Sequence, residues 1–137
     1  MSRENVDVVR EVIEANRSDA LDSRMAAILG RCDPRVEFRS VLAAVEGATY
    51  EGHDGVRSYF QDMAESWQEW RNELEEVLHV GPETVVVQIR FQAIGRDSGA
   101  EVEGRNAVIF VLADGKLLRV DSYPTREEAL EAVGLSD

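Results

Sequence analysis

The spacing of apolar residues changes once along this chain of 137 residues, near Asn72. Before that point apolar residues recur every three or four positions, and after it they alternate with polar ones. The first spacing is typical of an amphipathic helix and the second of a half-buried strand. Helices followed by strands that turn back on one another predict an α+β domain with an antiparallel sheet. One domain usually has ~150 residues, so we expect residues 1–137 to form a single domain.

Three helices are expected before the change. The first carries Val6, Val9 and Ile13 at helical spacing, and the second runs over 21–30. Asp54 is the expected N-cap of the third helix. Its apolar residues form one continuous stripe, which comprises Val56, Tyr59, Phe60, Met63, Trp67 and Trp70.

Strands and one last helix make up the rest of the expected chain. The strands are placed at 36–40, 74–80, 84–95, 101–113 and 116–123, with a short extended piece at 49–51 inside a loop over 41–53. Asp33-Pro34 and Asp114-Gly115 are turn signals. Thr125 to Glu128 is a capping box, which predicts a final helix that ends at Gly134. Long strands twist strongly, so a sheet covered by helices on one side would enclose a concavity suited to a ligand.

Four segments carry a resemblance to a known family. They are DPRVEF at 33–38, YEGHDGVR at 50–57, DGKL at 114–117 and REEALEA at 126–132. The order of elements resembles the nuclear-transport-factor-2-like superfamily, and these segments resemble its SnoaL-like, polyketide-cyclase-type branch. The resemblance implies a cone-shaped, curved antiparallel sheet covered on one face by N-terminal helices, the cystatin-like or ketosteroid-isomerase-like roll. That superfamily includes isomerases, epoxide hydrolases, cyclases, dehydratases and members without catalysis, so the fold does not name a reaction.

A mostly apolar pocket is expected inside the cone. Its predicted lining comprises Phe38, Tyr59, Met63, Trp67, Ile89, Phe91, Asn106, Val108, Phe110 and Ser122. Asn106, Ser40 and Ser122 are its expected polar groups. Such a lining favours a flat apolar or aromatic ligand. The alternative interpretation is that the aromatic stripe is ordinary core, and in a cone both can hold because the inner wall continues into the core.

The catalytic patterns of the superfamily match this sequence poorly. Ketosteroid isomerisation needs a base Asp, a Tyr and a protonated Asp. Here Phe38 stands at the base position, the first helix has no Tyr, and 101–113 has no Asp. Epoxide hydrolysis in the superfamily uses an Asp–Arg–Asp arrangement with Tyr and Asn. The residue types for it are present without a connecting motif, as Arg90, Arg105, Asn106, Asp121, Tyr59 and Tyr123.

Asp121 is the candidate catalytic residue. Aspartate is a poor strand former, yet this one lies within a predicted strand. One interpretation is a general acid or base at the pocket wall, with a pKa raised by partial burial. The other is an outward carboxylate, solvated or paired with an arginine, on the face that Arg119 and Tyr123 share. The alternation of the strand favours the second interpretation, because Leu118 and Val120 form the expected core pair.

The net charge and the cysteine content restrict which partners, compartment and cofactors are expected. Asp and Glu number 27 against 15 Lys and Arg, a net charge of −12, which disfavours nucleic acid and anionic membranes. The longest apolar run has seven residues, 107–113, against the ~20 that span a bilayer. The N-terminal residues do not resemble a signal sequence and Cys32 is a single cysteine, so we expect a cytoplasmic protein. His53 and His79 lack metal-ligand spacing, so no metal or other cofactor is expected.

A homodimer through the outer face of the sheet is also expected. That face carries the apolar residues Val86, Ile94, Ala107, Ile109 and Val111, with Gln88, Arg90 and Gln92 as polar contacts. Apolar residues on the face away from the helices must be shielded from water, and a second copy of the chain would shield them.

Three classes of function stay open: an acid/base enzyme, a non-catalytic binding protein, and a dimerisation module. The vacant isomerase positions favour binding of a small apolar or aromatic molecule without catalysis.

Overall fold

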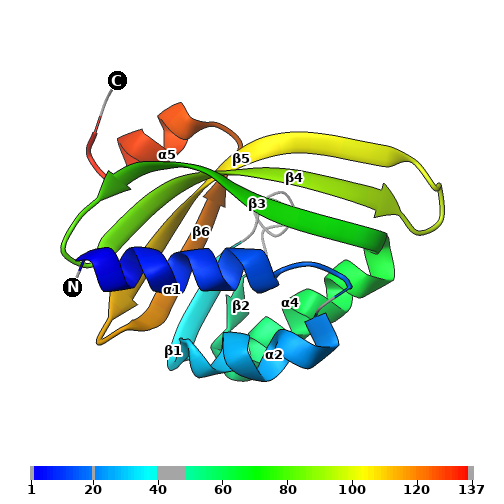
Figure 1. The fold of residues 1–137 in the computed structure, drawn as a ribbon, viewed down its shortest axis with the longest axis horizontal. Coiled ribbons are helices and arrows are strands. Elements are labelled where there is room, and N and C mark those ends of the chain that lie inside the picture. Colours follow the sequence, from blue (N-terminus) through cyan, green and yellow to red (C-terminus); the bar gives the residue numbers. More distant parts are fainter. Residues whose placement is uncertain (1, 20, 40–48, 136–137) are drawn as a thin grey trace.

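The computed structural model describes residues 2–19, 21–39 and 49–135, which form helices around a curved six-stranded sheet (Figure 1). The described helices are α1 (Ser2–Ala15), α2 (Leu21–Gly30), α4 (Gly52–Ser66) and α5 (Arg126–Ala132). The strands are β1 (Cys32–Arg39), β2 (Tyr50–Glu51), β3 (Trp67–Val80), β4 (Thr84–Gly95), β5 (Glu101–Ala113) and β6 (Lys116–Tyr123). They lie in the order β2-β1-β6-β5-β4-β3, and every neighbouring pair is antiparallel except β1 with β6. The expected α+β architecture is confirmed.

Two apolar layers lie on opposite faces of the sheet. Alternation along β4 turns Val85, Val87 and Ile89 toward α1 and α4, where they join the main core. Val86 lies on the other face, where α5 packs against β4, β5 and β6. The faces predicted for this strand from its period of two are therefore confirmed.

The boundary between α4 and β3 differs from the prediction. Trp67 and Trp70 lie in a strand, because α4 ends at Ser66 and β3 begins at the next residue. The pairing of β3 with β4 shifts register between Trp67 and Glu69, and a bulge of this kind puts two residues three apart on one face. Their spacing of three thus arises from a bulged strand. Arg96 secures the junction, since its backbone N–H donates to the Ser66 carbonyl (3.1 Å).

Two other element starts were also predicted wrongly. β1 begins at Cys32, so Pro34 lies inside the strand, where a register irregularity between Cys32 and Glu37 accommodates a residue without an N–H. α4 begins at Gly52 with Glu51 in the N-cap position, so Asp54 is a residue of the first turn. The loop predicted over 41–53 falls largely outside the described residues, as does Ser40.

The C-terminal elements agree with the sequence. Asp114 and Gly115 both have positive φ (53° and 75°), as the two-residue hairpin turn between β5 and β6 requires. Thr125 caps α5 by accepting a hydrogen bond from the Glu128 N–H (3.2 Å). Gly134, at φ 82°, ends the helix, and the Leu135 N–H returns to the Leu130 carbonyl (2.8 Å).

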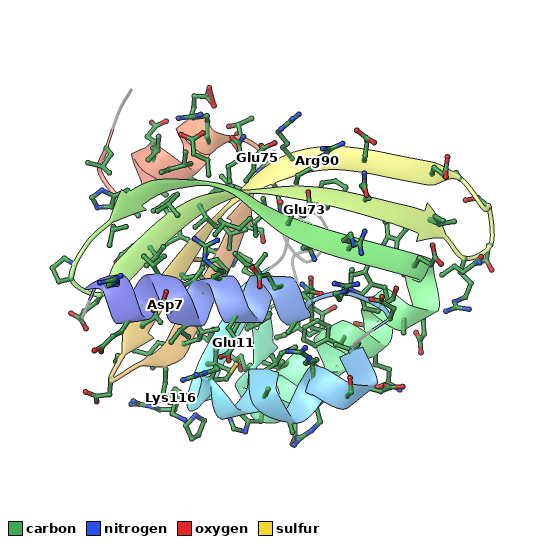
Figure 2. All side chains as sticks on the ribbon, in the orientation of Figure 1. Asp7, Glu11, Glu73, Glu75, Arg90 and Lys116 are labelled. Atoms are coloured by element: carbon green, nitrogen blue, oxygen red, sulfur yellow. The ribbon has the colours of Figure 1, made fainter. Side chains whose placement is uncertain are left out.

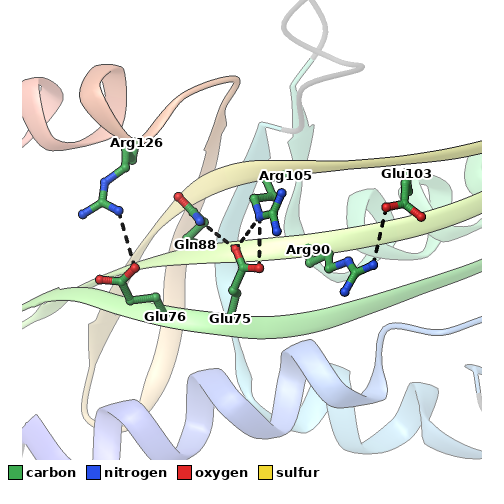
Figure 3. A network of polar contacts seen from close by, with 7 residues as sticks. All are labelled: Glu75, Glu76, Gln88, Arg90, Glu103, Arg105 and Arg126. Atoms are coloured by element: carbon green, nitrogen blue, oxygen red, sulfur yellow. Dashed lines mark hydrogen bonds and ion pairs between the residues drawn. The ribbon is translucent and has the colours of Figure 1, made fainter.

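The outer face of the sheet is covered differently from the expectation. α5 lays Ala129 and Leu130 on Val86, Ala107 and Ile109, so the chain itself supplies much of the cover assigned to a second copy. Val111 packs at the border of this cluster, while Ile94 lies outside it. Beyond α5 the face is polar (Figure 3). Its ion pairs and hydrogen bonds are Glu75–Arg105 (2.7 Å), Gln88–Glu75 (2.7 Å), Arg90–Glu103 (3.4 Å) and Arg126–Glu76 (3.4 Å).

Candidate ligand pocket

A cavity of about 370 Å³ lies between the helices and the concave face of the sheet, and we call it the cone pocket. The structure brings all ten residues of the predicted lining to it, namely Phe38, Tyr59, Met63, Trp67, Ile89, Phe91, Asn106, Val108, Phe110 and Ser122. They come from β1, α4, β3, β4, β5 and β6. The volume falls at the lower end of the range usual for ligand sites. A small molecule of two or three rings is the matching size class.

Eleven further residues also line the cavity, and two of them, Phe60 and Trp70, belong to the aromatic stripe that was expected either to line a pocket or to be ordinary core. The eleven are Val12, Ile13, Asn16, Arg39, Phe60, Trp70, Arg71, Asn72, Gln92, Ala93 and Val120. Part of this set had a signal, because Asn16 follows Ile13 by three residues on the stripe of the first helix. Asn72 had no such signal, because it follows the segment that was interpreted as one helix.

A larger groove of about 680 Å³ lies over the ends of β3, β4 and β5. Asp19, Glu69, Glu101 and Glu103 are among its lining residues, so it is polar and acidic. Small-molecule sites are concave and mostly apolar with a few polar groups. The cone pocket fits that description, and the acidic groove does not.

Asn16 fastens the end of α1 to β3 at one side of the cone pocket. Its side-chain Oδ1 accepts a hydrogen bond from Trp70 Nε1–H (2.9 Å), and its backbone carbonyl accepts one from Asn72 Nδ2–H (3.1 Å). Ser18 adds two backbone links, because its N–H donates to the Trp70 carbonyl (3.0 Å) and its Oγ accepts from the Trp70 N–H (3.1 Å). The indole ring of Trp70 is therefore held in one orientation at the pocket wall.

Tyr59 is the centre of an aromatic cluster at the floor of the cone pocket. Its ring lies 5.6 Å from Phe38, 5.5 Å from Tyr50 and 5.0 Å from Phe60, measured between ring centroids. Burial raises the pKa of the Tyr59 phenol to about 12, while a hydrogen bond with the Asn16 side chain acts in the opposite direction. The phenol is thus protonated at neutral pH, where it can donate a hydrogen bond but cannot serve as a base.

Asn106 presents an unused hydrogen-bonding group. Its Oδ1 is closed off from solvent and has no partner among the residues that the structure describes. Asn106 lies on β5 and pairs with Ile89 of β4. Val108 follows it on the same face of β5 and pairs with Ser122 of β6. This wall of the cone pocket is otherwise largely apolar.

Asp121 lies on the opposite face of the sheet from the cone pocket. Val120 and Ser122 line the cavity, and alternation along β6 turns Asp121 toward Ile109 and the layer beneath α5. The residue is only 7% exposed, and its Oδ2 forms an ion pair with Arg119 Nε (2.8 Å). The structure does not bring this carboxylate to the cavity.

The remaining candidates for catalysis are also dispersed. Arg90 and Arg105 belong to the polar network on the outer face, and Tyr123 packs beside α5. His53 Nε2 is hydrogen-bonded to the Cys32 carbonyl (2.9 Å), a contact that ties α4 to β1. Within the described ranges, no three His, Cys, Asp or Glu side chains lie close enough to share a metal ion.

The cone pocket carries little charge in a strongly acidic protein. No Asp, Glu, His, Cys or Lys is found among its described lining residues. Arg39 and Arg71 border it, yet both are exposed and alternate with the inward residues Phe38 and Trp70. Asp7 and Glu73, both labelled in Figure 2, are not among the residues that line the cavity. The site can bind and hydrogen-bond a guest, but its described part offers no general base.

Fold and cavity together define a small α+β protein of the cone-shaped type. This chain belongs to the SnoaL-like domain family, whose model matches residues 9–120. No curated protein matches it. In the part of the chain that the structure describes, no helix is both long and apolar enough to cross a bilayer.

Three solved structures illustrate the shared fold. An NTF2-like protein of unknown function from Burkholderia pseudomallei has a TM-score of 0.74 at 19% identity, over 93% of this chain and 95% of that one. TerC, co-crystallised with polyporic acid, has a TM-score of 0.75 at 18% identity, over 96% and 98%. An uncharacterized cystatin-fold protein from Novosphingobium aromaticivorans has a TM-score of 0.68 at 17% identity, over 90% and 98%.

Proposed function

We propose that this protein binds a small apolar or aromatic molecule in the cone pocket and does not catalyse a reaction. The observation that carries the proposal is the composition of the described lining. It combines aromatic and aliphatic side chains with neutral polar groups and two exposed arginines at the border, and it contains no acid or imidazole. A general base must reach the proton that it removes. Because the described lining has no general base, it supports binding of a ligand rather than proton transfer.

The shape and order of the aromatic residues support this proposal. Phe38, Tyr59, Trp67 and Trp70 come from three separate elements and surround one cavity. Aromatic rings present large apolar faces and pair with other rings in offset or edge-to-face geometry. The neighbour TerC was crystallised with polyporic acid, so a protein of this fold has been obtained together with a small organic molecule.

Tryptophan fluorescence provides the direct test, because Trp67 and Trp70 both line the cavity. Planar two-ring compounds such as 2-naphthol are expected to change it saturably. Ser122→Phe fills the cavity and is expected to abolish the response, while Glu103→Phe adds the same ring on the exposed outer face and preserves it. No response in the wild type, or an equal response in Ser122→Phe, would overturn the proposal.

The alternative function is an acid/base enzyme of cyclase, isomerase, dehydratase or epoxide-hydrolase type. The observation in its favour is Asp121, a buried carboxylate in mid-strand. An enzyme that depends on this acid should lose about 10²-fold or more in rate in Asp121→Asn. A binding protein should keep its affinity for 2-naphthol, because Asp121 faces away from the cavity.

A homodimer and a cytoplasmic location complete the proposal. The polar network beyond α5 holds Glu75, Glu76 and Glu103 against Arg90, Arg105 and Arg126, so it is balanced in charge on a chain of net charge −12. Two acidic copies repel each other least across such a surface. Analytical ultracentrifugation at micromolar concentration tests whether a dimer forms, and a result of monomer alone would exclude the dimer.

The cytoplasmic assignment is supported by Cys32, a single and buried thiol.

A further inference from the structure

Asn106 stands out among the polar groups of the cone pocket. Its Oδ1 is enclosed and has no hydrogen-bond partner among the described residues. A buried acceptor that has lost water without gaining a partner is unfavourable, and native proteins contain few of them. The group therefore requires an explanation. Asn106 lines the cone pocket, but its Oδ1 is closed to water in this structure, so the side-chain amide must turn for Oδ1 to meet a guest there.

The other two asparagines of the cavity differ from Asn106 because they are occupied. Asn16 Oδ1 accepts from Trp70 Nε1–H, and Asn72 Nδ2–H donates to the Asn16 carbonyl. These bonds join α1 to β3 and account for the two side chains structurally. Asn106 makes no comparable bond within the described residues, so nothing in the framework accounts for an amide at this position.

The surroundings of Asn106 also restrict the charge of a guest. Ile89 and Val108 adjoin it on the wall, and the inward polar groups of the lining are neutral. An anion or a cation that entered would lose its hydration without an opposite charge to meet it, which is strongly unfavourable. A neutral guest avoids that penalty.

We propose that Asn106 recognises the polar end of the ligand, and that the ligand is an uncharged aromatic or apolar molecule. Its hydroxyl or N–H group donates a hydrogen bond to Asn106 Oδ1, which the side-chain amide exposes by turning toward the cavity. This inference rests on the proposed function and adds the chemical class of the ligand. The ring system occupies the aromatic part of the cone pocket near Tyr59 and Trp67, and the donor meets the wall formed by β5.

Three naphthalenes that differ in one substituent test the inference. 2-Naphthol carries a donor, 2-methoxynaphthalene only an acceptor, and 2-naphthoate a negative charge. By fluorescence titration at neutral pH, 2-naphthol is expected to bind roughly fivefold to tenfold more tightly than 2-methoxynaphthalene. The charged 2-naphthoate is expected to bind most weakly.

Asn106→Leu is expected to remove this preference. The affinity for 2-naphthol should fall roughly fivefold to tenfold while that for 2-methoxynaphthalene stays unchanged. Gln88→Leu is the matched control, because it makes the same amide-to-leucine change on β4 at a position outside the cavity, where Gln88 contacts Glu75. It should leave all three affinities as in the wild type.

The outcomes separate the two proposals. If no probe binds, or if Ser122→Phe binds as well as the wild type, the proposed function itself fails. If the probes bind but 2-naphthol and 2-methoxynaphthalene do so equally, or Asn106→Leu keeps the preference, only the role of Asn106 is refuted. Tightest binding of 2-naphthoate refutes the neutral ligand and implicates Arg39 or Arg71. Asn106→Val repeats the test if the leucine variant does not fold.

Discussion

Gly55 lies in the first turn of α4, directly over β2, and leaves no room for a side chain. A Cβ at this position would lie 2.8 Å from the carbonyl carbon of Tyr50 and 3.3 Å from its Cα. Tyr50 is not free to yield, because its hydroxyl donates to Asp62 Oδ2 (2.7 Å) and its ring packs edge-on against Tyr59. Gly55→Ala must therefore separate β2 from α4 near the floor of the cone pocket.

Two opposing effects set the size of this perturbation. Alanine is favoured over glycine in a helix by about 1 kcal/mol. Forcing a methyl group into a filled space costs about 1–3 kcal/mol of stability. The cost at Gly55 lies at the upper end of this range, because the added Cβ meets backbone atoms rather than a flexible side chain. The net loss is about 2 kcal/mol in the free energy of unfolding. For a domain of this size that corresponds to a melting temperature lower by roughly 8 °C.

Thermal unfolding followed by circular dichroism measures the effect. Gly30→Ala is the matched control, because Gly30 ends α2 and an added Cβ meets nothing within 4 Å. We expect Gly30→Ala to melt at or slightly above the wild-type temperature. A Gly55→Ala variant that melts as high as Gly30→Ala would refute the steric argument and leave helix propensity as the dominant effect.

Three further predictions concern Gly104, Tyr59 and Cys32. A Cβ on Gly104 would lie 3.0 Å from the Phe91 ring, so Gly104→Ala should push that ring into the cavity and weaken 2-naphthol binding severalfold; unchanged affinity in a titration would show that the ring yields elsewhere. Because burial raises the pKa of Tyr59 above its usual 10.0 to about 12, the stability this group contributes is complete below pH 10 and is lost as pH rises to 12. Chemical unfolding over that range should therefore show a shallower loss in Tyr59→Phe than in the wild type, and parallel curves would contradict the assignment. Cys32 is 2% exposed and burial raises the pKa of its thiol to about 11, so a disulfide reagent at mildly alkaline pH should label it only after unfolding in urea; rapid labelling of the native protein would contradict this.

The pocket lining was predictable because the period of two fixes the faces of a strand. Once Ile89 and Phe91 are assigned inward, Asn106, Val108 and Phe110 follow from the antiparallel pairing, and the structure places all five in one cavity. Whether that cavity holds a ligand stays a prediction.

Features that depend on contacts distant in sequence were not predictable. The bulge after Trp67 reproduces helical spacing within a strand, so the residue pattern alone cannot distinguish the two structures. Asn16 acquires its role through hydrogen bonds to Trp70 and Asn72, more than fifty positions away. The capping box at Thr125 predicts that a helix begins, but not that α5 lies on the outer face of the sheet.

The two edge strands of the sheet affect whether the protein aggregates at high concentration. β3 forms one border, where its pairing with β4 is irregular at three places and Ser18 occupies the peptide groups of Trp70. β2, at the other border, is only two residues long. As far as the structure describes the chain, neither border strand offers an incoming extended segment a long, regular row of unpaired peptide groups, and edges of this kind protect natural sheets against fibre growth. We therefore expect concentrated solutions to stay free of amyloid-like material.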